Sequence, residues 1–172
     1  MPDLKLRDVY RCTHVERWNV VDTVRRQNVA EHQYLVALVV DRYCTLLGLG
    51  PSVRGEAVVT ALKHDLAEVL TGDVPTPTKR HLNGSFEELE RSVTFDGRDT
   101  RSTQRVKELV NFADLVEAAV WLGRYGLGSH ARKVRRHLET QLLELDPENA
   151  RLLLYECEEV EETLPGLSEG VP

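Results

Sequence analysis

The chain has 172 residues, of which 41% are hydrophobic and 29% are charged, and its formal net charge is −6. The length suits one domain with its own core, and the acidic balance argues against non-specific binding to nucleic acid. No apolar stretch approaches the roughly 18 residues that a membrane-spanning helix needs, and the N-terminal residues lack the apolar segment of a signal peptide. Three widely spaced cysteines without a CxxC pair are typical of reduced thiols, so we expect a cytoplasmic protein.

The first long helical pattern covers residues 28–47. Asn28 is a favourable N-cap, and Glu31 follows three residues later, as in a capping box. Apolar residues then recur at helical spacing until a glycine ends the pattern. A second helix is predicted over residues 54–71, with Gly72 just past its end.

Four more helical segments follow in the second half of the chain. They are predicted as a short helix from Ser85, then over 102–125, over 129–145, and from Pro147 to Leu164. Asp146 supplies an N-cap for the last of them, and proline is favoured at a first helical position.

No stretch of the chain shows sustained period-2 alternation or a hairpin signal. The sequence therefore predicts an all-α fold, a single-domain bundle of about six to seven helices. We expect the domain to span residues 1–164 and the tail over residues 165–172, which contains Gly and Pro, to be flexible.

Ionisable residues interrupt the apolar sides of three of these helices. They are His32 in the first, His64 and Asp65 in the second, and Asp114 in the helix over 102–125. Burying such a group is costly unless it is paired or bound to a metal. Two imidazoles and two carboxylates form a mixed nitrogen and oxygen set that suits a divalent transition metal. On a six-coordinate ion they would leave positions for water and substrate, as metal catalysis requires.

Each of these residues alone is a weak signal, since a single histidine in a helix is more often a core or surface residue than a ligand. The ordered series H…HD…D on successive helices is what favours a metal site. The basic run over 132–136 is interpreted as a solvated helix face. The remaining histidines lack such a setting and are interpreted as surface or loop residues: His14, His81, His130 and His137.

Three stretches of the chain resemble the HD-domain phosphohydrolases, and among them the 5′-deoxynucleotidase branch. They are ERWNVVDTVRRQNVAEHQYLVA (16–37), KHDLAEVLTGDVPTPTK (63–79) and LVNFADLVEA (109–118). The segment from His64 to Pro77 is far more specific than a bare HD pair. The short interval between Asp65 and Asp114 is similar to that of compact phage members that dephosphorylate deoxyadenine nucleotides. The resemblance implies an HD-type helical bundle.

The resemblance implies a divalent transition metal, Zn²⁺, Co²⁺ or Mn²⁺, that is held by His32, His64, Asp65 and Asp114. A second ion, Mg²⁺ or Co²⁺, is an option. Such a metal would polarise a phosphoryl oxygen and activate water. Glu68 matches the catalytic glutamate of the family, acting beside Asp65, and could orient or deprotonate water or protonate the leaving oxygen. In a continuous helix Glu68 shares a face with His64 and Asp65. The alternative for Glu68 is an ion pair that faces solvent.

The resemblance also implies contacts to the substrate before the first long helix. Arg17 and Trp18 match a substrate-contacting pair, in which arginine can bind phosphate through two hydrogen bonds. The indole would pack on sugar or base and reject a ribose hydroxyl. Val20 matches a position near the base. The alternatives for Trp18 and Val20 are a core aromatic and a core valine.

A second group of expected contacts follows the HD pair. Asp73 could accept a hydrogen bond from the 3′-hydroxyl, and the run that begins with Pro75 and Thr76 would hold this loop stiff as one wall of the sugar pocket. Lys79 is a candidate phosphate contact, with a solvated surface lysine as the alternative. From the resemblance we expect a lysine three residues before Asp114, where this chain has Asn111, so the number of phosphates on the substrate stays open.

The leading prediction is a metal-dependent hydrolase that removes 5′-phosphates from 2′-deoxynucleotides, with deoxyadenine nucleotides favoured (dATP or dAMP to deoxyadenosine). The alternatives are a general 5′-deoxynucleoside monophosphate nucleotidase, another HD hydrolase of ribonucleotide signals, and a non-catalytic nucleotide-binding protein. The intact ligand set with Glu68 argues against the last. The expected partners are a small deoxynucleotide and further copies of the chain, in a dimer or hexamer, with neither nucleic acid nor a membrane.

Overall fold

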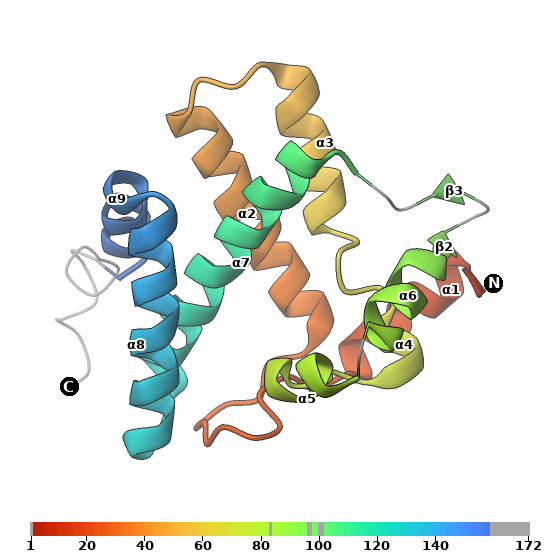
Figure 1. Ribbon diagram of the computed structural model, residues 1–172, viewed down its shortest axis with the longest axis horizontal. Coiled ribbons are helices and arrows are strands. Elements are labelled where there is room, and N and C mark those ends of the chain that lie inside the picture. Colours follow the sequence, from red (N-terminus) through yellow and green to blue (C-terminus); the bar gives the residue numbers. More distant parts are fainter. Residues whose placement is uncertain (1, 83, 96–97, 100–101, 159–172) are drawn as a thin grey trace, which may run out of the picture.

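The computed structural model describes residues 2–82, 84–95, 98–99 and 102–158. It confirms the all-α prediction: α7 runs through the middle of a helical bundle and contacts α2, α3, α8 and α9 (Figure 1). These long helices are α2 (Val29–Leu46), α3 (Pro51–Ala61), α7 (Gln104–Tyr125), α8 (Gly128–Leu145) and α9 (Pro147–Glu158). None of the described helices is long and apolar enough to cross a membrane.

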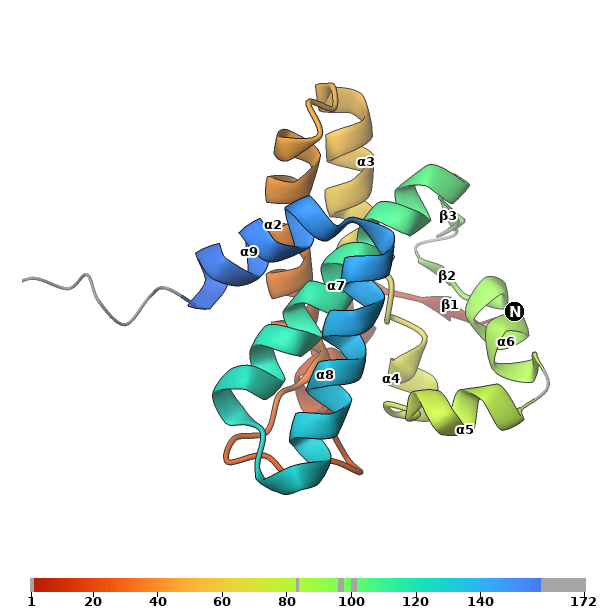
Figure 2. The same ribbon diagram turned by 60° about the vertical axis from the view of Figure 1, so that its left-hand side comes forward.

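Smaller elements lie on the side of the bundle away from α8 and α9 (Figures 1 and 2). They include α4 (Glu68–Thr71), α5 (Thr76–His81) and α6 (Ser85–Ser92), while α1 (Leu6–Val9) and the 3-10 helix η1 (Tyr10–His14) follow each other near the N-terminus. The predicted helix from Ser85 is thereby confirmed as α6.

A small sheet, not expected from the sequence, joins the beginning of the chain to the segment after α6. Its strands are β1 (Asp3–Leu4), β2 (Thr94–Phe95) and β3 (Arg98–Asp99), with β1 parallel and β3 antiparallel to β2. Strands of two residues are too short to carry an alternating pattern, which is why the sequence gives no sign of them.

The main core lies between α2, α3 and α7, with α8 and α9 closing it. Val36 and Val40 of α2 and Val116 of α7 are fully buried there, together with Leu142 of α8. Apolar residues recur on more than one side of α7, because helices pack around it on several sides. This helix is therefore a rigid platform for any polar group that it carries.

The ends of α2 and α9 follow the predicted caps. The Asn28 side chain accepts a hydrogen bond from the backbone N–H of Glu31 over 2.9 Å. The Asp146 carboxylate accepts one from the backbone N–H of Asn149 over 3.2 Å. The predicted extension of the last helix to Leu164 and the tail over 165–172 fall outside the described residues.

The prediction of one continuous helix over residues 54–71 is wrong. Helix α3 ends at Ala61, and tight turns with bonds between residues three apart lead to α4, such as Glu68 N–H to the Asp65 carbonyl over 3.0 Å. His64 explains the break: its Nδ1 lies 2.6 Å from the Ala61 carbonyl oxygen, which would otherwise accept the next helical bond. His64 and Asp65 therefore lie in a turn and not in the middle of a helix.

Candidate active site

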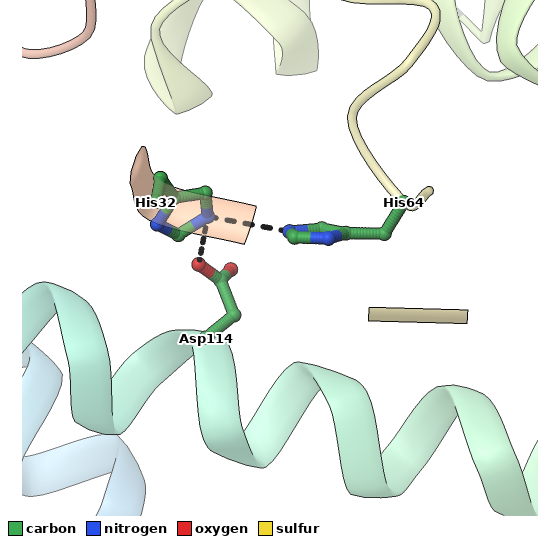
Figure 3. A group of neighbouring side chains, drawn as sticks. All are labelled: His32, His64 and Asp114. Atoms are coloured by element: carbon green, nitrogen blue, oxygen red, sulfur yellow. Dashed lines mark hydrogen bonds and ion pairs between the residues drawn. The ribbon is translucent and has the colours of Figure 1, made fainter. Parts of the chain in front are cut away.

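Three predicted metal ligands from distant parts of the chain face one point. His32 projects from α2, Asp114 from α7, and His64 from the turn after α3 (Figure 3). His32 Nε2 lies 3.2 Å from Asp114 Oδ1 and 3.3 Å from His64 Nε2. One potential ligand atom from each residue lies within 4.8 Å of the others.

Asp65 borders the same point without belonging to that closest group of three. Its Oδ2 lies 3.5 Å from His32 Nε2 and 3.4 Å from His64 Nε2. Two imidazole nitrogens and carboxylate oxygens from Asp65 and Asp114 thus converge, and this is a donor set that fits a divalent transition metal.

The charges around this point act on its titratable groups in opposite directions. Burial and the charge of Arg17 lower the pKa of His32, but hydrogen bonds to Asp114 and Glu117 outweigh them and raise it to about 9. Burial raises the pKa of Asp114, but its bond to His32 and nearby positive charge bring it well below the usual range. Since a histidine ligand must be free of its proton on the binding nitrogen, metal binding here would release a proton.

Glu68 is buried, with 1% of its surface exposed, at the first residue of α4. Its Oε1 lies 3.1 Å from Lys79 Nζ, and its buried Oε2 has no hydrogen-bond partner among the described residues. Burial, followed by the negative charge of Asp65, raises the pKa of Glu68 to about 8. The alternative of a solvent-facing ion pair is therefore wrong for Glu68. The solvated-lysine alternative is wrong for Lys79, since its side chain is 26% exposed and contacts this buried carboxylate.

Arg17 reaches the edge of the metal-ligand group. Its guanidinium lies 3.9 Å from Asp114 and 3.7 Å from Glu117, and its side chain is 14% exposed. Trp18 follows in a half-buried position and packs near Val21. Trp18 is the one non-glycine residue of the described chain with a positive φ, 64°, which is unfavourable for a bulky side chain.

Val20 is 61% exposed, so the core-valine alternative is wrong. It lines a hollow of about 440 Å³ together with Arg26 and Leu127.

Asp73 lines a second hollow of about 480 Å³ together with Glu16 and Asn19. Burial raises the pKa of Asp73, and the positive charges of Arg17 and Lys79 act against this effect without outweighing it. The stiff loop predicted after Asp73 is shorter than expected: Pro75 is the N-cap of α5, and Thr76 already begins that helix.

The four remaining histidines are exposed, as predicted: His14, His81, His130 and His137. In the basic run over 132–136, Arg132, Lys133 and Arg136 are exposed, while Arg135 pairs with Glu139 and Glu158.

Two buried polar residues at the site were not identified from the sequence. Glu117 accepts a hydrogen bond from Gln27 Nε2 over 2.6 Å, and its other oxygen lies 2.7 Å from His32 Nδ1. The sequence held one signal for Glu117: a carboxylate three residues after Asp114, on the same face of an apolar helix. Gln27 had no such signal, because it precedes the α2 cap in a polar loop.

Comparison with known proteins identifies relatives over most of the chain. Residues 6–96 match a family described as YfbR-like, 5′-deoxynucleotidase YfbR-like. A dATP triphosphohydrolase of Salmonella phage PMBT28 is 37% identical, over 73% of this chain and 69% of that protein. A dATP triphosphohydrolase of Cyanophage S-2L is 34% identical, over 81% of this chain and 83% of that protein. The solved structure of a Cyanophage S-2L HD phosphohydrolase (DatZ), bound to dA and one catalytic Zn²⁺ ion, matches with a TM-score of 0.71 at 30% identity, covering 93% of this chain and 98% of that one.

Proposed function

The chain belongs to the YfbR-like family of 5′-deoxynucleotidases, and on that premise we propose that it hydrolyses the 5′-phosphates of 2′-deoxynucleotides with the help of a divalent metal. The observation that carries the proposal is the convergence of His32, His64 and Asp114 on one point, with potential ligand atoms within 4.8 Å of one another. Such a group of donors in a buried setting is costly without a bound cation.

His32, His64, Asp65 and Asp114 would hold the metal. When bound, a divalent metal supplies Lewis-acid stabilisation of the charge on phosphoryl oxygens. The structurally similar phage protein was solved with one Zn²⁺ ion bound, which makes zinc the first candidate here. Co²⁺ and Mn²⁺ are the other ions that suit this donor set.

Glu68 would handle the proton of the reaction. A carboxylic acid whose pKa lies near 8 can both take and give a proton close to neutral pH. Its Oε2, which has no hydrogen-bond partner among the described residues, is available to an attacking water or to the leaving oxygen, while Oε1 is held by Lys79. Asp65 contributes to catalysis as a ligand and through the negative charge that raises the pKa of Glu68.

The remaining predicted contacts would bind the two ends of the nucleotide. Arg17 and Lys79 supply positive charge for the phosphates. Asp73 and Trp18 would hold the deoxyribose. Val20 would select the base by shape. Pro75 and Thr76, at the start of α5, would form part of the sugar wall.

Two substrate classes have support of different kinds. The relatives named dATP triphosphohydrolases favour dATP, converted to deoxyadenosine. The family match to 5′-deoxynucleotidases favours deoxynucleoside monophosphates, and the exposed Asn111, where the resemblance led us to expect a lysine, supplies no charge that a triphosphate could use. We favour deoxyadenine nucleotides and keep the general monophosphate nucleotidase as the second candidate.

The test is a panel of deoxy- and ribonucleotides with one and three phosphates, incubated with the metal-stripped protein and added Zn²⁺, Co²⁺, Mn²⁺ or Mg²⁺. The expected result is release of phosphate from deoxyadenine nucleotides at a higher rate than from ATP or AMP. An Asp114→Ala variant is the control for contaminating phosphatases. Hydrolysis that is independent of metal, or absent from every deoxynucleotide, would contradict the proposed function.

The proposal includes a cytoplasmic location, in the host cell if the protein is phage-encoded, and assembly into a dimer or hexamer. The three cysteines Cys12, Cys44 and Cys157 are free, which fits a reducing compartment. Light scattering after size-exclusion chromatography would measure the assembly directly.

A further inference from the structure

Four polar side chains form a continuous hydrogen-bonded chain from the loop of Trp18 to the metal-ligand group. Trp18 Nε1 donates to Gln27 Oε1 over 3.0 Å, and Gln27 Nε2 donates to Glu117 Oε1 over 2.6 Å. The second oxygen of Glu117 lies 2.7 Å from His32 Nδ1. Gln27, Glu117 and His32 are 0%, 4% and 0% exposed, so bulk water does not compete for these contacts.

Chemistry fixes the direction of every bond in this chain. An indole N–H can only donate, so Gln27 must turn its oxygen toward Trp18 and its NH₂ group toward Glu117. The carboxylate then accepts from Gln27 with one oxygen and from Nδ1–H of His32 with the other. A histidine with its single proton on Nδ1 has a lone pair on Nε2, and Nε2 is the atom that faces the other candidate ligands.

Trp18, at the end of this series of hydrogen bonds farthest from the metal-ligand group, has a strained backbone. The φ of 64° at Trp18 persists only if the surroundings fix it. Gln27 contacts this loop twice, through the indole of Trp18 and through its own carbonyl, which accepts from the Arg17 backbone N–H over 2.8 Å. The side chain of one buried glutamine thus touches both the Trp18 loop and the carboxylate behind His32.

We propose that Gln27 and Glu117 are positioning residues, which set the tautomer of His32 and the orientation of the Trp18 indole together. The inference rests on the proposed function, because it concerns a metal ligand and a residue that would contact the deoxyribose. A carboxylate behind a metal-binding histidine fixes the ring and its tautomer. Here the carboxylate is linked by one amide to the proposed sugar-binding indole, so that the two parts of the site are aligned by one set of bonds.

A single exchange of carboxylate for amide must create a mismatch in this chain. In Glu117→Gln, the new side chain offers one acceptor oxygen where two donors arrive, from Gln27 and His32. Either His32 changes tautomer and loses Nε2 as a ligand, or Gln27 turns its NH₂ group toward the indole N–H of Trp18. Adding Gln27→Glu removes the mismatch: residue 27 then accepts from the indole and from the new amide, and the oxygen of that amide accepts from His32.

The experiment measures Zn²⁺ affinity by competition with a chromogenic chelator for the wild type, Glu117→Gln, Gln27→Glu and the double exchange. Glu117→Gln should weaken Zn²⁺ binding roughly 10- to 100-fold, and the double exchange should recover most of that loss. Glu108→Gln is the matched control, since Glu108 is exposed on the same helix and also accepts from a glutamine, Gln104, over 2.9 Å. It should bind Zn²⁺ as the wild type does.

A role in packing alone predicts no change, because the exchanged side chains have the same shape. Unchanged Zn²⁺ affinity in Glu117→Gln would therefore overturn the proposal. A loss that the double exchange fails to recover would also overturn it, by assigning the effect to the charge of Glu117 and not to the matched donors and acceptors.

A second readout separates this inference from the proposed function, because it needs no metal. In ¹⁵N-labelled wild-type protein, the Trp18 indole N–H should exchange slowly with solvent, and Gln27→Met should accelerate that exchange at least several-fold while the protein stays folded. Trp121 serves as the internal reference, since its buried Nε1 has no hydrogen-bond partner among the described residues. A wild type that binds no metal would refute the proposed function. An equal exchange rate of the Trp18 indole N–H in the wild type and in Gln27→Met would refute the proposed role of Gln27 as a positioning residue.

Discussion

At the scale of single residues, the site depends on two carboxyl groups, those of Asp65 and Glu68, whose neighbours shift their pKa values in opposite directions. Burial raises the pKa of Asp65, but the charges of His64 and His32 outweigh it and hold that pKa below its usual value. Burial and Asp65 raise the pKa of Glu68 to about 8. Because the pKa of Asp65 is lowered and that of Glu68 is raised, Asp65 stays ionised as a ligand while Glu68 can exchange a proton near neutral pH.

Glu68→Gln should lower kcat roughly 10²- to 10⁴-fold with little change in KM. The amide keeps the shape of the side chain and can neither take nor give the proton. The measurement is steady-state kinetics on a deoxyadenine nucleotide, with metal analysis of the same preparation to show that the ion is retained. A kcat close to that of the wild type would remove Glu68 from the mechanism.

Lys79→Met should move the pH profile of kcat to higher pH. The positive charge of Lys79 lowers the pKa of Glu68, against the larger effects of burial and Asp65, so removing it raises that pKa above about 8. A higher pKa shifts the limb governed by Glu68 upward in pH, whether the residue acts as a base on the rising limb or as an acid on the falling limb.

Lys107→Met, at an exposed position of α7, is the control for the loss of one positive charge. It should leave the profile in place. The position of the limb is the quantity to compare, because the height of the profile also falls if Lys79 binds phosphate. An unshifted limb in Lys79→Met would show that this lysine does not act on Glu68.

At the scale of elements, the helix ends could be predicted where a local signal sets them. Asn28 and Asp146 cap α2 and α9 with their own side chains. The end of α3 could not be predicted in this way, since no glycine or proline marks it. It depends on the bond between His64 and the Ala61 carbonyl, and so on a residue that serves the site.

Gly72→Ala tests whether the backbone at the end of α4, directly before Asp73, requires a glycine. Gly72 has φ 74° and ψ 170°, a conformation available almost only to glycine. A Cβ there meets nothing within 4 Å, so the cost of about 1–3 kcal/mol in the free energy of unfolding comes from the backbone alone.

Gly55→Ala is the matched comparison for this effect. Gly55 lies inside α3, where an added Cβ also meets nothing within 4 Å, and alanine there should stabilise the protein by about 0.5–1 kcal/mol. Urea unfolding of both variants measures the difference. Equal stability changes would contradict the assignment of strain to Gly72.

At the scale of the whole molecule, the site exists because α7 packs against both α2 and α3, and the turn after α3 brings His64 to the same point as His32 and Asp114. The sequence indicated the candidate ligands through their order and spacing, and the resemblance assigned roles to them. The sequence could not indicate that Gln27 donates a hydrogen bond to Glu117, since 90 positions separate the two residues and neither carries a local pattern for that pairing. Contacts of this kind follow only from how the helices pack.

We propose that a divalent metal binds where α2, α7 and the turn after α3 meet, at His32, Asp114 and His64. The most direct measurement is the number of Zn²⁺ ions bound per chain, by mass spectrometric metal analysis of stripped and reloaded protein, for the wild type and for Asp114→Ala. The proposed site predicts one tightly held ion per chain in the wild type and strong depletion in the variant, with both proteins folded by circular dichroism. Equal metal content in the two proteins would contradict the assignment of this site.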